Sequence, residues 1–227
     1  MNPIKTKKAF QEFLRQNKDA WQFAEKASDD YLLARCGLSN NLWSSFEMAT
    51  QSVEKLLKSY LLFTDSSLQG KGREVYHAVS KKSRLLGRNT EAGHNIEACL
   101  FLAGKAGLPL NTVLENQITR INAYYNNRYP NEDSPSLLST SELNSFDAAI
   151  FEIWDAFESI DEDYFYVHGI MTHVYSKLHK DRSSSSSLLE NSFQIMTSGN
   201  NSYNVRKAKF EEGIYRRLEE WYPRSSD

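Results

Sequence analysis

Cations placed beside tyrosines have the clearest capacity for chemistry in this sequence. Arg120 and Arg128 flank a pair of adjacent tyrosines, Tyr124 and Tyr125. A planar guanidinium suits phosphate, and a tyrosine ring offers a face for stacking. Together with polar residues of other helices, this pattern predicts a groove that takes a nucleotide or a phosphate-bearing chain. The predicted ligand-binding residues are Lys55, Lys58, His94, Asn95, Arg120, Tyr125 and Arg128.

The same residues also have a structural interpretation. Tyrosines at the end of a helix usually pack half-buried and keep the hydroxyl in contact with water. Arg128 is followed by an acidic segment, so its guanidinium can pair with a carboxylate of the same chain. The sequence leaves both interpretations open.

Charge is distributed unevenly along the 227 residues, although the net charge is only -2. Residues 69–90 contain six Lys or Arg and one Glu, whereas residues 129–176 contain ten Asp or Glu and no Lys or Arg. The first region can attract phosphates and the second repels them. The alternative is a pair of solvated surfaces that complement each other within the fold or a dimer.

Hydrophobic periodicity predicts an all-α protein. Apolar residues recur at steps of three and four, the spacing of one helical face, most clearly in residues 42–63. That range has the pattern of a helix packed nearly antiparallel in a bundle. The polar stretch 64–93 predicts a long connection with one helical turn at 75–79. Further helices are expected at 19–38, from 96, at 110–125 and at 141–160.

The expected organisation is an antiparallel bundle of four to five helices with a helical C-terminal extension. A lead-in helix covers residues 1–17, and the bundle covers 18–162. The extension, 163–227, contains a run of five serines at 183–187 that is typical of a flexible link. Its final helix is predicted at about 205–221.

Several other classes of protein find no support in the sequence. No apolar run approaches the roughly 18 residues of a membrane span, and no apolar signal core follows the first residues, which favours the cytoplasm. Cys36 and Cys99 are interpreted as buried free thiols. His168, His173 and His179 do not share one helical face, so neither a metal site nor a cofactor is predicted.

Four short motifs follow one another between residues 20 and 160. They are Ala27-x-x-Asp30-Tyr31-x-x-Ala34, Phe46-x-x-Ala49-x-Gln51-x-x-Glu54-Lys55-x-x-Lys58, Gly93-His94-Asn95-Ile96 and Tyr124-Tyr125-x-x-Arg128-Tyr129-Pro130-Asn131. This ordered set resembles the HEPN domain family. The resemblance implies a bundle of four or five antiparallel helices that usually pairs as a homodimer.

The resemblance implies two kinds of activity. Many family members are RNases, often toxins paired with a nucleotidyltransferase-like antitoxin. Others, including the domain at the end of sacsin, look like nucleotide binders without nuclease activity. The RNase members carry an Arg followed, after four to six residues, by a His, usually late in the bundle. Arg88 and His94 match this spacing but precede the third helix of the bundle, and no histidine follows Arg128 before His168.

An Arg–His pair supplies what RNA cleavage without a metal requires. The arginine stabilises charge that develops on the phosphate, and the histidine moves a proton near neutral pH. Arg88 and His94 are therefore the candidate catalytic residues. The first interpretation remains a non-catalytic HEPN-like homodimer that binds a nucleotide, an RNA or a partner protein. A HEPN-type endoribonuclease is the alternative, and a structural subunit of a protein assembly is the third.

Overall fold

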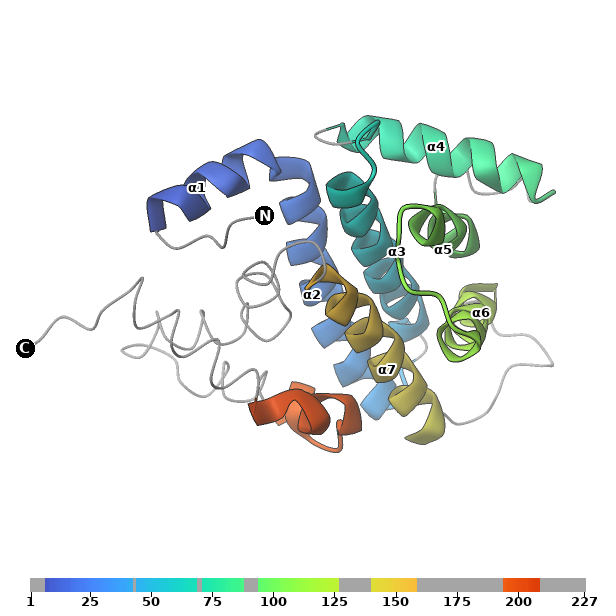
Figure 1. The fold of residues 1–227 in the computed structure, drawn as a ribbon. Coiled ribbons are helices and arrows are strands. Elements are labelled where there is room, and N and C mark those ends of the chain that lie inside the picture. The colour runs from blue at the N-terminus through green and yellow to red at the C-terminus, as the bar shows by residue number, and fades with distance from the viewer. Residues whose placement is uncertain are drawn as a thin grey trace, which may run out of the picture.

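The computed structural model describes residues 7–42, 44–68, 71–87, 94–126, 140–158 and 194–208. All regular secondary structure in these ranges is helical, which confirms the all-α prediction. Short helical segments cover 194–197 and 201–208. None of the described helices is long and apolar enough to cross a membrane. The labelled helices of Figure 1 are α1 (Lys7–Gln16), α2 (Lys18–Ser39), α3 (Ser45–Thr64), α4 (Gly72–Leu85), α5 (Ile96–Lys105), α6 (Thr112–Asn126) and α7 (Thr140–Phe157).

Helix α3 is the central element of the fold. It packs against α2, α4, α5, α6 and α7 (Figure 1). A helix with neighbours on most sides buries most of its circumference, so the polar side chains of α3 need partners within the fold. The expected inward face is buried from Phe46 to Tyr60, whereas Leu42 at the start of the predicted range precedes the helix and is 54% exposed. Leu57, Leu61 and Leu62 on the other sides of α3 are buried as well. The buried residues of the expected face are Phe46, Ala49, Val53, Leu56 and Tyr60.

Helices α2 and α3 run antiparallel and approach each other closely. The Ser52 hydroxyl donates to the carbonyl oxygen of Ala27 at 2.8 Å, and the Ser59 hydroxyl donates to that of Ala20 at 2.7 Å. Small side chains allow this spacing. At position 37 the close approach requires glycine, since an added Cβ would lie 1.8 Å from the Ser45 Oγ. The pair forms the frame on which the other helices pack.

Helix α4 shows that the prediction of a long connection over residues 64–93 is wrong. It forms because Val75, Val79 and Ser83, four residues apart, are buried along one face. This stripe is too narrow to give a strong periodic signal in the sequence. At the start of α4, the Gly72 backbone N–H donates to the Asp19 carboxylate of α2 at 2.8 Å. A cap from a different helix is not visible in local sequence.

A buried polar network joins α2, α7 and the C-terminal part of the chain. The Arg35 guanidinium donates to the Asp147 carboxylate at 3.0 Å and to the Ser198 carbonyl oxygen at 2.8 Å. The Tyr31 hydroxyl donates to Asp147 at 2.7 Å and accepts from the Asn200 amide at 2.9 Å. Residues 194–208 are thus tied to the bundle through hydrogen bonds.

The ends of the chain also contribute to the hydrophobic core. Phe13 of α1 stacks on Phe63 with ring centroids 5.9 Å apart, while Met196 and Tyr203 are buried in the same core. The last described helical segment begins at residue 201, ahead of the expected start at 205. The first part of the predicted C-terminal extension, including the serine run at 183–187, lies outside the described residues.

We predict that Arg35→Met lowers the free energy of unfolding by about 3–5 kcal/mol, because it leaves a buried carboxylate without its cation. Burial raises the pKa of Asp147 to about 6, and Arg35 opposes that shift. An acid whose pKa is raised by folding stabilises the folded state at low pH, and this contribution is lost as the pH rises through about 6. Without Arg35 the raised pKa rises further. Denaturant unfolding should therefore show a larger loss at pH 8 than at pH 5.

The double variant Arg35→Met/Asp147→Asn is the matched control, since it removes the titrating group as well as the cation. Its stability relative to wild-type should lack the additional loss at pH 8. An Arg35→Met variant that loses the same stability at both pH values would contradict this account of the network.

Candidate functional site

The Glu54 carboxylate on α3 holds two nitrogen-bearing side chains from different parts of the chain. Its Oε1 lies 2.6 Å from the Lys58 Nζ and 3.0 Å from the His94 Nδ1. The Lys58 side chain is wholly buried, and that of Glu54 is 8% exposed. The sequence indicated the i,i+4 spacing of Glu54 and Lys58, but neither the burial of this pair nor the contact with His94 was predicted.

His94 is exposed and held in one orientation. Its side chain is 54% exposed, and its ring meets the edge of Tyr76 of α4 with centroids 5.5 Å apart. The carboxylate of Glu54 only accepts hydrogen bonds, so the neutral imidazole carries its hydrogen on Nδ1. The Nε2 atom then keeps a lone pair, and a carboxylate-oriented imidazole of this kind can accept a proton.

Tyr76 completes the cluster from the side of α4. The Lys58 ammonium lies 3.8 Å from the centroid of its ring, a cation–π contact in a desolvated place. Residues from α3, α4 and the start of α5 therefore converge around Lys58. We call Glu54, Lys58, Tyr76 and His94 the histidine cluster.

A second ion pair on α3 lies one residue away along the helix. The Lys55 ammonium pairs with the Asp30 carboxylate of α2 and also approaches the Gln51 side-chain oxygen at 3.3 Å. Burial raises the pKa of Asp30, and Lys55 opposes that shift. Both predicted lysines of α3 are thus occupied by carboxylates from within the fold.

Asn95 has a structural role at the start of α5. Its side-chain oxygen accepts from the Ala98 backbone N–H at 2.8 Å, the hydrogen bond of a helix N-cap. This confirms the predicted helix start after residues 93–95. Asn95 also follows His94 directly, so the cap fixes the backbone next to the histidine cluster.

The register of α5 and α6 brings the end of α6 toward His94. The Asn122 side-chain amide donates to Glu97 in the first turn of α5 at 3.0 Å. The last turn of α6, which contains the backbone of Tyr125, follows Asn122 and lies at the level of the start of α5. Arg120 is directed elsewhere, since its guanidinium lies 3.9 Å from the Glu142 carboxylate of α7.

The remaining predicted residues cannot be placed. Arg88 and Arg128 lie outside the described residues, as does the side chain of Tyr125. Of the predicted set, the structure brings Lys58, His94 and Asn95 together, with Lys55 nearby on α3. Arg120 does not join them.

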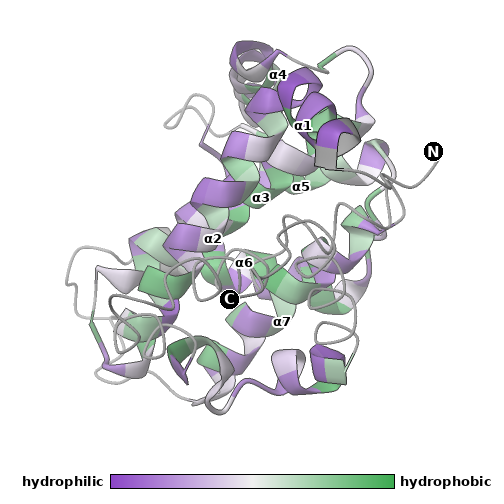
Figure 2. Ribbon diagram, turned by 90° about the vertical axis from the view of Figure 1, so that its left-hand side faces the viewer, coloured by the Kyte–Doolittle hydropathy of each residue, from purple (hydrophilic) through white to green (hydrophobic). Residues whose placement is uncertain are grey.

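Helix α4 carries cations whose arrangement the sequence did not show. Arg73, His77, Lys81 and Arg84 are exposed, and within the described residues none of them has an ion-pair partner. Hydrophilic residues dominate α4 in Figure 2. Lys82 differs, because its ammonium lies 3.2 Å from the Phe101 ring centroid. We call Arg73, Lys81 and Arg84 the α4 cations.

The cysteines do not add a reactive centre to this region. Cys99 is buried as predicted, whereas Cys36 is only partly buried, and both are free thiols. Burial raises the pKa of the Cys99 thiol to about 12. Only the thiolate is a strong nucleophile, so Cys99 is inert near neutral pH. Among the described residues, no group of three or more His, Cys, Asp or Glu side chains is placed to hold a metal ion.

Comparison of the chain with protein-family models, curated proteins and solved structures gave no match.

We predict that neutral His94 carries its hydrogen on Nδ1, because the Glu54 carboxylate accepts it. Long-range ¹H–¹⁵N correlation spectra of the imidazole distinguish the two tautomers directly. Exposed His77 on α4 is the matched control and should show mainly the Nε2–H form usual in water. Glu54→Gln should increase the Nε2–H fraction at His94. An Nε2–H form of His94 in the wild-type protein would contradict the Glu54 contact.

Proposed function

We propose that this chain is a HEPN-like module that binds RNA through the exposed face of α4, and that it acts as a homodimer in line with the family resemblance. The observation that supports RNA binding is the contrast between two sets of cations. The lysines of α3 are neutralised by Asp30 and Glu54, whereas the α4 cations have no carboxylate partner in the described part of the chain.

Paired and unpaired cations differ in what they offer a phosphate. A phosphate that approached Lys58 would have to displace Glu54 and enter a buried place, which costs several kcal/mol. An exposed, unpaired arginine or lysine meets phosphate without that cost and releases counterions from the nucleic acid. The positive charge that attracts a phosphate to this region therefore comes from α4.

The α4 cations favour recognition of the RNA backbone. Arg73 and Arg84 are eleven residues apart, which is three helical turns, so they occupy the same side of α4. Tyr76, on an adjacent side of α4, is the one aromatic residue in this helix, so base stacking contributes little. Binding should consequently depend strongly on salt and weakly on sequence.

The first test is the double variant Arg73→Gln/Arg84→Gln, which removes two α4 cations. Single-stranded nucleic acid gives a slope of about -0.7 per phosphate contact in plots of log K against log salt. The variant should therefore bind RNA more weakly and reduce the magnitude of this slope by roughly 1.4. Fluorescence anisotropy with a labelled RNA at several salt concentrations measures both quantities.

Lys8→Gln/Lys18→Gln is the matched control, since it removes the same formal charge from exposed positions on α1 and α2. It should leave the slope close to the wild-type value. Equal weakening by both double variants would mean that net charge alone attracts RNA, and the assignment to α4 would be wrong.

A metal-independent endoribonuclease is the second candidate function, and the Glu54–His94 contact favours it. Glu54 orients an exposed imidazole whose Nε2 can take the proton of a 2′-hydroxyl, the attacking group in this kind of cleavage. Arg88, the proposed partner of His94, would stabilise charge on the phosphate. In the sequence, Arg88 comes three residues after the end of α4 and six residues before His94.

If this second function holds, His94→Ala abolishes RNA cleavage in the presence of a chelator, and Glu54→Gln reduces it. His77→Ala, the matched histidine control on α4, retains the wild-type rate. Single-turnover cleavage of labelled RNA, with the RNA affinity measured in parallel, separates a loss of chemistry from a loss of binding. If the wild-type protein binds RNA but leaves it intact, the nuclease candidate fails and the binding module stands.

A further inference from the structure

A pocket lies on the flank of α4 that faces away from the histidine cluster. Its volume is about 450 Å³, and it is bounded by α4 and by the turn that follows α3. Tyr76 faces the histidine cluster, whereas the pocket is lined from α4 by Glu74, His77, Ala78 and Lys81, which lie away from that cluster. Ser67, Leu68 and Lys71 line it from the preceding turn and the start of α4.

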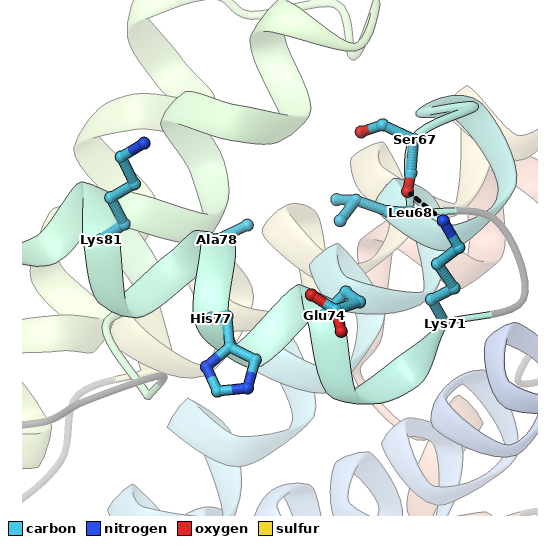
Figure 3. Close-up of a pocket in the computed structure, with 7 residues that line it drawn as sticks. All are labelled: Ser67, Leu68, Lys71, Glu74, His77, Ala78 and Lys81. Atoms are coloured by element: carbon cyan, nitrogen blue, oxygen red, sulfur yellow. Dashed lines mark hydrogen bonds between the residues drawn. The ribbon is translucent and has the colours of Figure 1, made fainter.

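The pocket combines two lysines, a histidine, one carboxylate and an apolar wall. Figure 3 shows Lys71 and Lys81 at opposite ends of the pocket, with Glu74 and Ala78 between them. The side chain of Leu68 points into the space between the two lysines, and His77 also lines the pocket from α4. Lys71 approaches the Ser67 carbonyl oxygen at 3.4 Å, which leaves most of its donor capacity unused.

These groups set the chemistry of a ligand. An ammonium group attracts a phosphate, but a lone carboxylate between two ammonium groups repels a simple anion. A carboxylate accepts hydrogen bonds from hydroxyl groups, and neighbouring hydroxyls of a sugar supply two such donors. The apolar surface of Leu68 and Ala78 suits the carbon skeleton of a ring.

We propose that this pocket binds a phosphorylated sugar, either free or as part of a nucleotide. Lys71 or Lys81 contacts the phosphate, and Glu74 accepts hydrogen bonds from the sugar hydroxyls. The proposal does not depend on RNA binding by α4 or on catalysis at His94. Lys81 borders both surfaces, whereas Lys71 and Glu74 belong to the pocket and Arg73 and Arg84 to the RNA-contacting face.

The test is isothermal titration of the full chain with ribose 5-phosphate, adenosine 5′-monophosphate, adenosine and inorganic phosphate. Ribose 5-phosphate should bind more tightly than phosphate, because it adds the contacts to Glu74. Lys71→Gln should weaken ribose 5-phosphate binding roughly tenfold, the effect of a lost charge-assisted hydrogen bond. The ratio of affinities for the monophosphate and ribose 5-phosphate tells whether a base contributes.

Glu74→Gln distinguishes a sugar site from a simple anion site. It should weaken ribose 5-phosphate severalfold and strengthen inorganic phosphate, because the repelling charge is removed. Lys8→Gln on α1 is the matched control, an exposed lysine outside both surfaces, and should leave ribose 5-phosphate affinity unchanged. Absence of binding by ribose 5-phosphate and the monophosphate, or stronger binding of ribose 5-phosphate to Glu74→Gln, overturns the proposal. Methyl chemical shifts of Leu68 and Ala78 should move on binding, and an unmoved pair places the ligand elsewhere and also overturns it.

Discussion

Two lysines on the central helix, one fully buried and one partly buried, are each compensated by a carboxylate within the fold. Lys58 is paired with Glu54 and Lys55 with Asp30. A buried ammonium without such a partner would cost several kcal/mol, so these pairs are required for α3 to occupy its central position. The same carboxylate of Glu54 orients His94, which couples the packing of α3 to the one exposed histidine at the start of α5. Much of the electrostatic character of the molecule follows from this constraint.

Because the lysines of α3 are paired with carboxylates, the unpaired cations of this region of the described structure lie on α4. This helix is anchored by a narrow buried stripe, by the Asp19 cap and by the contacts of Tyr76 and Lys82, so its outer face can be polar. Tyr76 connects the two regions, since its ring contacts both Lys58 and His94. An RNA held along α4 would therefore pass close to His94, and the binding and nuclease candidates share one surface and differ in whether chemistry follows.

The sequence predicted the main helices because their buried faces are wide. In α3, steps of three and four between large apolar residues identified the inward face correctly. In α4 the buried positions are two valines and a serine, and the cap comes from residue 19, so local pattern could not reveal the helix. The candidate site was likewise predictable only where it depends on local spacing. The i,i+4 relation of Glu54 and Lys58 was visible, but the burial of this pair and its contact with His94 depend on packing between residues 40 positions apart.

The central claim is that the lysines of α3 are withheld from ligands and that the charge presented to RNA is on α4. Acetylation footprinting with mass spectrometry tests this by comparing lysine reactivity with and without RNA. The account predicts that Lys81 reacts rapidly and is protected by RNA, that exposed Lys18 on α2 reacts rapidly in both conditions, and that Lys58 reacts slowly in both. Rapid reaction of Lys58 in the free protein, or protection of Lys18 equal to that of Lys81, would contradict the account.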